Sequence, residues 1–442
     1  MAKPMVARRA ALLAPLLLAG CQTFDDWFST KKEPLPGKRE DVRTTQRGLA
    51  VDEGAPKVTL PPAVRNAAWP QAGGNPAHLM GHLAANERLA PAWTASIGSG
   101  GGYREIILAQ PVSADGRVHT MDSDGVVSAF ALSTGERLWR VDTKDRKADS
   151  TNVGGGLAVD QGIVYATNGL GDILALDAAK GETRWRKALA GPARSSPTVA
   201  EGRIFVTTIE DRLQALSTED GRVLWTHRAA TAAAVMLGQP APAFARGLVV
   251  AGFGSGEIAA LRADTGSVAW TDELGVARGR GSLADFFSVR GAPVIADGRV
   301  LAIGLGGLTT AIDLPSGRRL WERQLAGSDS PWAAGNWMFV LSAEQELAAL
   351  NTTDGRVAWI TALPRFANPE KQKDSLTWFG PILLGDRLIV TGRGEEALSI
   401  SPYTGEILGR RGLSAAASPV SPIAVDGTLL VVSDDARLLA LR

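Results

Sequence analysis

Over most of the chain, short apolar or alternating runs are separated by polar turns that contain glycine. No stretch places apolar residues at helical spacing for more than a turn or two. Asp115-Gly116 and Thr134-Gly135 are hairpin signals, because glycine adopts positive φ without steric cost. The four runs around these turns, read as successive strands, are Pro111–Ala114, Val118–Met121, Val126–Leu132 and Glu136–Val141.

This four-strand unit recurs along the chain. In six copies a glycine precedes a tryptophan by four positions, and a seventh copy has Gly405 followed by Gly409. A second pattern, a proline followed five positions later by a turn residue, runs in step with the first and brings the number of copies to eight. The glycine–tryptophan pairs are Gly135/Trp139, Gly181/Trp185, Gly221/Trp225, Gly266/Trp270, Gly317/Trp321 and Gly355/Trp359.

Repeated four-stranded units are the signature of a β-propeller. We therefore predict an all-β fold, an eight-bladed propeller of four-stranded antiparallel blades, over residues 67–442. The last copy ends at its third strand, Leu438–Arg442, and an extra fourth-strand match lies at Leu89–Trp93. The N-terminal strand is thus expected to complete the eighth blade and close the ring, which hides the strand edges. The tryptophans are expected to pack between blades, with ligand contact as the alternative.

Composition excludes several classes of function. The formal charge of +1 gives no strong field for a nucleic-acid backbone. One cysteine rules out an internal disulfide, a cysteine zinc site and an iron–sulfur cluster, and four histidines leave little for a histidine-rich metal centre. No metal site and no cofactor are predicted.

The N-terminus reads as a targeting segment. Residues 1–20 combine a basic start with an apolar run that is too short to span a bilayer. The run ends at Leu18-Ala19-Gly20-Cys21, which resembles a bacterial lipobox, so Cys21 is expected to be lipidated; an ordinary signal peptide with an unrelated cysteine is the alternative. Gln22 implies sorting to the outer membrane under the rule that this motif resembles. Residues 21–66 are charged and rich in proline, and are expected to form a largely disordered tether.

The repeat Ala175–Trp185 resembles the tryptophan-docking repeat of quinoprotein dehydrogenases. Together with the lipobox, Leu35–Arg39, Trp69–Asn75 and eight copies, the chain is similar to the BamB family, the non-enzymatic lipoproteins of the outer-membrane β-barrel assembly machine. The resemblance implies a lipid-anchored scaffold on the periplasmic face of the outer membrane. It also implies a partner like BamA, through its POTRA domains, and membership of the rest of that complex.

The enzymatic alternative is a periplasmic quinoprotein-like (PQQ) dehydrogenase or a ligand-binding propeller. In the dehydrogenases the resemblance implies a quinone beside a vicinal disulfide and a calcium ion. Cys21 is the only cysteine, so that disulfide cannot form. We therefore predict that the protein is not an enzyme.

Candidate partner contacts lie in long connections between blades, where function usually resides. Strand alternation places three long segments, 226–241, 271–292 and 361–380, on one face of the ring. They carry the apolar residues Phe366, Trp378 and Phe379, which are expected to be exposed. The resemblance places the partner contacts at two family motif positions. The chain keeps the apolar character of the first motif without its arginine and lacks both acids of the second, and Met236 and Leu237 could instead cap a blade core. The predicted contact residues are Met236, Leu237, Gly238, Phe286, Phe287, Ser288 and Arg290.

Two weaker candidates remain. His78 and His82 are four residues apart, which would suit a metal on a helix, but they lie in a loop-like sequence that favours ordinary loop structure. Arg278, Arg280 and Arg290 form a local basic loop, either a solvated surface or a partner contact. Neither candidate adds a catalytic residue.

Overall fold

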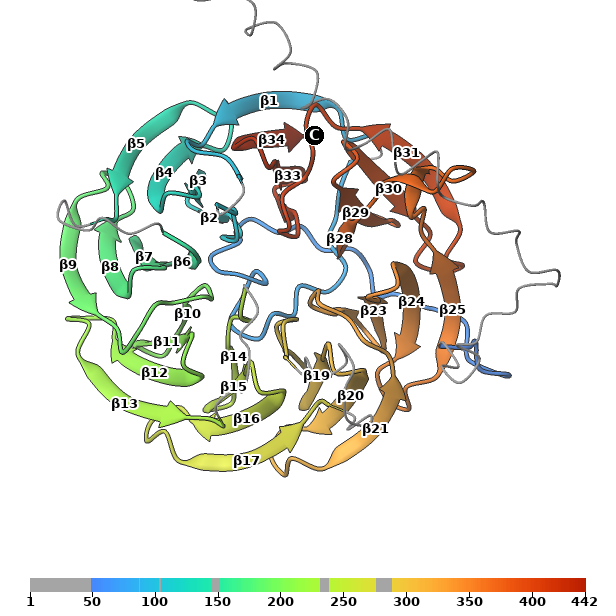
Figure 1. Cartoon of the computed structure of the whole chain (residues 1–442), viewed down its shortest axis with the longest axis horizontal. Coiled ribbons are helices and arrows are strands. Elements are labelled where there is room, and N and C mark those ends of the chain that lie inside the picture. Colours follow the sequence, from blue (N-terminus) through green and yellow to red (C-terminus); the bar gives the residue numbers. More distant parts are fainter. Residues whose placement is uncertain (1–48, 87, 103–104, 145–151, 231–237, 276–287) are drawn as a thin grey trace, which may run out of the picture. The chain divides into compact units, whose positions relative to one another are not determined.

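The computed structural model describes residues 49–86, 88–102, 105–144, 152–230, 238–275 and 288–442. Within these residues the regular elements are β-strands, arranged as eight four-stranded antiparallel sheets and one two-stranded hairpin. Over 49–442 the sheets follow one another around a ring as the blades of a propeller (Figure 1). The predicted all-β, eight-bladed fold is therefore confirmed. No helix in the described part is long and apolar enough to cross a membrane.

The blades are numbered here in chain order. Blades 1 and 2 contain β2 (Val112–Ala114), β3 (Arg117–Met121), β4 (Val126–Ala131), β5 (Arg137–Asp142), β6 (Gly155–Asp160), β7 (Ile163–Asn168), β8 (Asp172–Asp177) and β9 (Thr183–Ala188). Blades 3 and 4 contain β10 (Thr198–Ala200), β11 (Arg203–Thr208), β12 (Arg212–Ser217), β13 (Val223–Arg228), β14 (Ala243–Ala245), β15 (Leu248–Gly252), β16 (Glu257–Arg262) and β17 (Val268–Glu273). Blades 5 and 6 contain β18 (Val294–Ala296), β19 (Arg299–Ile303), β20 (Leu308–Asp313), β21 (Arg319–Gln324), β22 (Trp332–Ala334), β23 (Trp337–Leu341), β24 (Glu346–Asn351) and β25 (Val357–Ala362).

Blade 7 contains β28 (Trp378–Leu383), β29 (Leu388–Gly392), β30 (Glu396–Ile400) and β31 (Ile407–Gly412). Blade 8 contains β32 (Ile423–Val425), β33 (Thr428–Val432), β34 (Arg437–Leu441) and the N-terminal β1 (Pro91–Ser96). The hairpin of β26 (Phe366–Asn368) and β27 (Lys373–Ser375) lies between blades 6 and 7.

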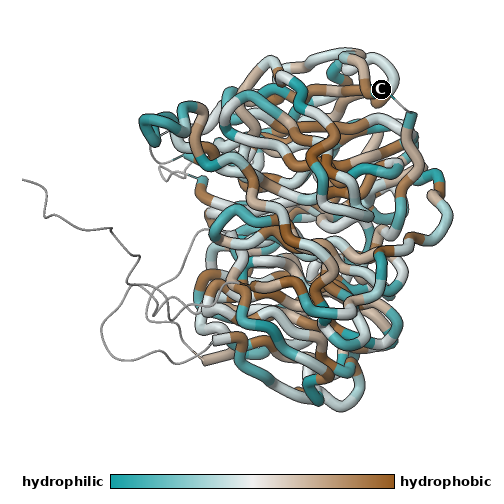
Figure 2. Tube along the Cα trace, turned by 90° about the vertical axis from the view of Figure 1, so that its right-hand side faces the viewer, coloured by the Kyte–Doolittle hydropathy of each residue, from teal (hydrophilic) through white to brown (hydrophobic). Residues whose placement is uncertain are grey.

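Burial explains why the strand pattern changes across a blade. The middle strands are buried on both faces, as β4 is along most of its length, because neighbouring blades pack against both sides. The outermost strand alternates exposed and partly buried residues, as in β5. Figure 2 shows the corresponding distribution, with apolar segments through the inside of the molecule and polar turns at its outside.

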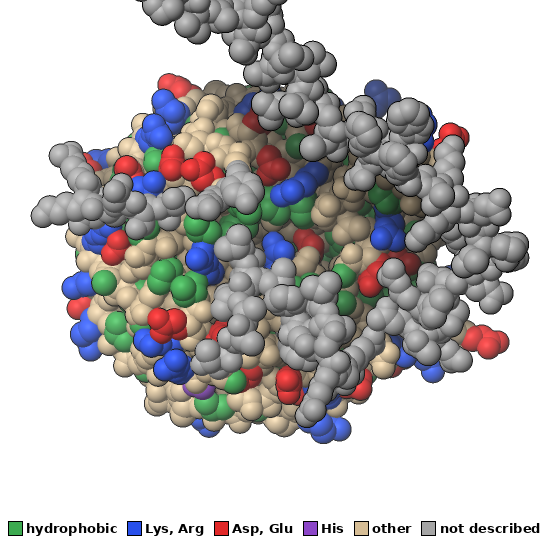
Figure 3. Space-filling view, in the orientation of Figure 1, with side chains coloured by type: hydrophobic (Ala, Val, Ile, Leu, Met, Phe, Trp, Pro, Cys, Tyr) green, Lys and Arg blue, Asp and Glu red, His purple; other side chains and the backbone are tan. Residues whose placement is uncertain are grey.

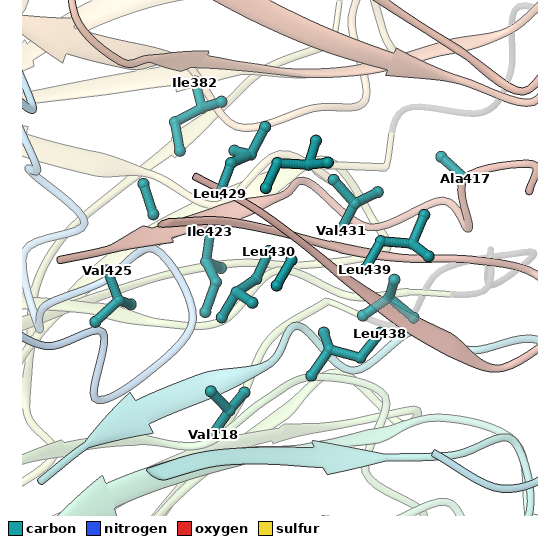
Figure 4. Close-up of a cluster of buried hydrophobic side chains, with 14 of the residues drawn as sticks. Val118, Ile382, Ala417, Ile423, Val425, Leu429, Leu430, Val431, Leu438 and Leu439 are labelled. Atoms are coloured by element: carbon teal, nitrogen blue, oxygen red, sulfur yellow. The ribbon is translucent and has the colours of Figure 1, made fainter. Parts of the chain in front are cut away.

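The ring is closed by β1, as predicted. This strand pairs antiparallel with β34, with Pro91 opposite Leu441 and Ala95 opposite Leu438. The backbone N–H of Arg442 donates to the carbonyl of Ala90 at 2.7 Å. The closing blade packs an apolar cluster in which Leu438 and Val118 lie on facing blades (Figure 4). Segments that lie far apart in the sequence, near the two ends of the propeller, therefore share one hydrophobic core.

The repeated tryptophans dock each blade onto the next. In seven junctions the indole Nε1–H donates to a carbonyl of the following blade at 2.7 to 3.3 Å. In the same junctions a Cβ added to the repeat glycine of that blade would lie 2.4 to 2.8 Å from the indole. The predicted packing role is thus what the geometry shows. The seven tryptophans are Trp93, Trp139, Trp185, Trp225, Trp270, Trp321 and Trp359.

Residues 64–85, named here the axial segment, run around the centre of the ring (Figure 1). This segment exchanges hydrogen bonds with all eight blades, close to their innermost strands. The hydrogen-bonded pairs are Asn66–Asp426, Trp69–Ser113, Pro70–Val159, Gln71–Val199, Pro76–Phe244, Ala77–Ile295, Gly81–Trp332 and Leu83–Gly385.

Residues 49–63 also lie on the propeller, which differs from the expected disorder of the whole 21–66 tether. Val58 is buried in the cluster between blades 6 and 7. The Asp52 carboxylate accepts from the Val357 N–H at 2.8 Å and pairs with Arg323 at 2.9 Å. Side-chain contacts with residues this far away in the sequence cannot be read from composition, so the predicted tether extends too far toward the C-terminus. The predicted signal peptide, Cys21 and the tether up to residue 48 lie outside the described residues.

Candidate functional site

The two faces of the ring differ in the length of their loops. Strands alternate in direction, so the first and third turns of each blade share one face, and the blade connections share the other with the second turns. The first face carries tight turns such as Asp115-Gly116. The second face carries the long connections between β13 and β14, between β17 and β18, and between β25 and β28. We call this second side the long-loop face.

The structure brings two of the predicted contact residues together on this face. Gly238 and Arg290 line the same pocket at the ring axis, and a Cβ on Gly238 would lie 3.5 Å from the Arg290 Nε. Ser288 is only 5% exposed, and its carbonyl accepts from the Leu305 N–H at 3.1 Å. The side chain of Ser288 is therefore not presented to a partner, unlike the prediction. Met236, Leu237, Phe286 and Phe287, and the basic residues Arg278 and Arg280, lie outside the described residues.

Two aromatic residues that were expected to be exposed are buried. Trp378 is 1% and Phe379 is 9% exposed, because β28, the innermost strand of blade 7, begins at residue 378. The Trp378 indole donates to the Pro364 carbonyl at 2.7 Å. Phe366 is partly exposed, on the hairpin that sequence reasoning missed. Of these three residues, only Phe366 remains available to a partner.

The axial pocket has a volume of about 160 Å³ and is lined by Arg194, Gly238, Gln239, Arg290 and Asp329, among others. Ala72 of the axial segment also lines it. The walls come from chain segments that lead into the innermost strands of several blades. Arg194, Gln239 and Asp329 were not predicted, because residues this far apart in sequence meet only through the ring. Figure 3 shows apolar, basic and acidic side chains near the centre of the ring in this view.

Burial shifts the pKa of two charged groups of the axial pocket. Burial raises the pKa of Asp329 to about 6, against the Gly380 N–H that donates to it at 3.2 Å and the charge of Arg290. Burial also lowers the pKa of Arg194, whose Nη1 donates to the Val153 carbonyl. The pocket thus holds two guanidinium groups around one carboxyl group that is harder to ionise than usual.

The amide of Gln239 is held only on its donor side. Its Nε2 donates to the Asp211 carboxylate at 3.2 Å, and its backbone N–H donates to the Arg194 carbonyl at 3.1 Å. Within the described residues the buried Oε1 accepts no hydrogen bond. A protein loop that brings an N–H to this pocket would satisfy that acceptor.

The axial pocket does not suit the quinone and calcium ion of the dehydrogenases that the repeat resembles. Calcium takes about 6–8 oxygen ligands, with carboxylates prominent among them. Among the described lining residues the only carboxylate belongs to Asp329, and Arg290 lies beside it. In the described part of the chain no three histidine, cysteine, aspartate or glutamate side chains come together as metal ligands.

The two predicted metal-ligand candidates are loop residues with other bonds. His78 Nδ1 lies 2.8 Å from the Pro293 carbonyl, and His82 bonds the carbonyls of Pro61 and Gly385 at 2.7 and 3.0 Å. Both rings hold the axial segment on the blades. The alternative of ordinary loop structure therefore describes them.

Comparison with known proteins gives a consistent result. The family model described as outer membrane protein assembly factor BamB matches residues 123–361. BamB of Yersinia pestis is 28% identical over 272 residues, which is 60% of this chain and 69% of that protein. The crystal structure of BamB from Moraxella catarrhalis superposes with a TM-score of 0.68 at 19% identity, over 80% of this chain and 99% of that one. The quinohemoprotein alcohol dehydrogenase of Comamonas testosteroni shares the fold, with a TM-score of 0.64 at 15% identity over 86% of this chain and 81% of that one.

Proposed function

This chain belongs to the family of the outer membrane protein assembly factor BamB, and on that premise we propose that it is a non-catalytic scaffold of outer-membrane protein assembly. In this proposal the propeller is anchored by a lipid on Cys21 at the periplasmic face of the outer membrane. Its partner is the central barrel-assembly subunit, a BamA-like protein with POTRA domains. Through this subunit the protein would also associate with the other members of the barrel-assembly complex.

One observation carries the choice of surface. Three long blade connections leave the ring on the same face, and two of them bring Gly238 and Arg290 together at the axis. Loops on a rigid scaffold are the usual place for recognition. The apolar pairs Met236-Leu237 and Phe286-Phe287 occur in the same two connections. A contact built on this face would combine apolar anchors with the arginine at the pocket.

The chemistry of the axial pocket supports a scaffold rather than an enzyme. Its single described carboxyl group lies beside an arginine, and Cys21 is the only cysteine in the chain. The residues present therefore do not fit the quinone site of the dehydrogenases, although the fold is shared.

The proposal is tested by placing charge in the expected contact. Replacing Met236 and Leu237 with Asp should abolish co-purification with the barrel-assembly complex, because apolar anchors at the centre of an interface each contribute about 2 kcal/mol or more. Val268→Asp is the matched control, since Val268 is 46% exposed on the outer strand β17, away from the axis. This control should bind like the wild type.

Circular dichroism on the same preparations distinguishes a lost contact from a lost fold. We expect the double variant to melt as the wild type does. A lower melting temperature would instead mean that Met236 and Leu237 cap a blade core. If the folded double variant binds at full strength, the partner does not use this face.

A further inference from the structure

One of the eight blade junctions lacks its docking tryptophan. In β31 the corresponding residue is Gly409, which pairs with Ser399 as Trp139 pairs with Ala129 in blade 1. A Cβ built on Gly409 has no atom within 4 Å, and the backbone there is not in the left-handed region. The position is therefore open to a large side chain, but the chain does not supply one.

The missing indole leaves a cavity at the outer edge of the junction between blades 7 and 8. We name it the seam groove; its volume is about 430 Å³, within the usual range of about 300–1,000 Å³ for ligand sites. Its apolar wall includes Ile389 and Leu408 of blade 7 and Leu429 and Leu441 of blade 8. The groove lies on the rim of the ring and shares no residue with the axial pocket.

The charges that line the seam groove have one sign. The four charged lining residues are Arg88, Arg387, Arg410 and Arg411, with no acidic residue among the lining. Arg387 and Arg411 donate to the backbone carbonyls of Asn86 and Leu89. Arg410 faces Glu396 at 3.8 Å, at the limit of an ion pair.

The other junctions show which side chains fill the corresponding space between two blades. In blade 1 the indole of Trp139 lies against the His119 ring, with centroids 5.5 Å apart, and donates to the Ala178 carbonyl at 3.0 Å. At the seam Ile389 occupies the place of His119, since it pairs with Ser399 as His119 pairs with Ala129. The apolar wall for an aromatic ring is thus present, and only the ring is missing.

We propose that the seam groove is a second docking site, for a segment of a partner protein that presents an aromatic side chain next to acidic residues. The aromatic ring fills the place of the absent tryptophan, and its carboxylates meet the arginines at the rim. Arginine–carboxylate pairs are the strong, directional contacts of such interfaces, and buried aromatic residues are their usual anchors. This site is independent of the contact proposed on the long-loop face.

The test uses the full mature chain and a synthetic peptide, acetyl-Asp-Glu-Trp-Glu-Asp-amide, titrated by calorimetry. We expect saturable binding that Gly409→Trp weakens about tenfold or more, because the chain's own indole then fills the groove. Gly412→Trp is the matched control. It lies in the same strand, has nothing within 4 Å of its Cβ and does not line the groove, so it should bind like the wild type.

Two further arms separate the aromatic and the ionic contributions. The same peptide with Ala in place of Trp should bind about tenfold more weakly, and so should the wild-type peptide to the Arg88→Glu, Arg410→Glu variant. If Gly409→Trp fails to fold, this charge variant still tests whether the peptide binds at the seam groove. The proposal is overturned if the peptide does not saturate, if the Ala peptide binds equally well, or if folded Gly409→Trp keeps full affinity. Equal loss in Gly409→Trp and Gly412→Trp would also overturn it.

Discussion

Glycine and tryptophan act as a pair at each docked junction. Gly266 has a φ of 72°, which disfavours any side chain, and a Cβ there would lie 2.6 Å from the Trp225 ring. The indole can therefore lie flat on the backbone of the next blade only where this residue is glycine. Periodic glycines in the sequence predicted the turns, but not this contact.

The contact can be measured by comparing two glycines of blade 4. Gly247 has a φ of 74° and no atom within 4 Å of an added Cβ, so Gly247→Ala isolates the backbone cost of about 1 kcal/mol. Gly266→Ala should cost about 1–3 kcal/mol more, because it also displaces Trp225. Urea denaturation of both variants gives the free energies of unfolding. Equal losses would mean that the indole does not depend on this glycine.

A buried histidine makes stability depend on pH. The His119 ring packs under Trp139 where other blades place Tyr165, Phe205 and Phe339 under their tryptophans. Burial lowers its pKa to about 4, from an ordinary value near 6.5. Between pH 4 and pH 6.5 the unfolded chain therefore binds a proton at His119 that the folded chain does not bind. The resulting stability is full above pH 6.5 and is lost as the pH falls toward 4.

Replacing His119 with Phe should remove this dependence while keeping the ring under the indole. We expect the wild type to lose about 2 kcal/mol more than His119→Phe between pH 7 and pH 4.5. His78, with its pKa also lowered to about 4, acts in the same direction, and Asp329, raised to about 6, acts in the opposite one. Both groups are present in the wild type and in His119→Phe, so their contributions cancel when the stability losses of the two proteins are subtracted. Parallel pH curves would show that His119 does not titrate as described.

At the scale of elements, the sequence predicts what local patterns control. The predicted strand Val118–Met121 lies within the observed β3, and the N-terminal strand pairs where the count of strands required it. Turn glycines and the alternation of buried and exposed residues along a strand depend on only a few neighbouring residues. Both can therefore be recognised in a single sequence. Because these local patterns recur eight times along the chain, the number of blades and the closure of the ring could be predicted from them.

The elements that the sequence does not reveal are held by distant partners. The axial segment has no periodicity, because each of its residues bonds a different blade. The exposed hairpin β26–β27 lacks apolar alternation. At the candidate site, Gly238 and Arg290 are predicted from the resemblance, which places the family's partner motifs in two long connections. Arg194 and Asp329 join them only through the closed ring. Convergence at the axis is a tertiary property.

Closure of the ring is tested by two deletions. Removing residues 67–95 takes away β1 and most of the axial segment, leaves the edge of β34 unpaired and should abolish a cooperative thermal transition. Removing 22–48, which precedes the first described contact, should leave the melting temperature unchanged. Circular dichroism and size-exclusion chromatography of both proteins provide the measurement. Similar melting curves would contradict the closure described here.

At the scale of the whole molecule, the propeller and the proposed anchor have separable roles. The described ring is closed by its own strands and presents its long connections on one face. The proposed partner contacts and the seam groove are both formed without residue 21. Removing the lipid should therefore change where the protein resides, but not whether it folds or binds.

Cys21→Ser tests this separation. A single acyl chain binds membranes only marginally, so stable anchoring needs the several chains of a modified lipoprotein cysteine. We expect wild type to stay in outer-membrane fractions after an alkaline carbonate wash, which strips proteins held only by protein contacts. Cys21→Ser should be released by that wash or remain an unprocessed precursor, with an unchanged melting temperature and unchanged partner binding in detergent. Retention of the washed variant at the wild-type level would mean that Cys21 is not the anchor.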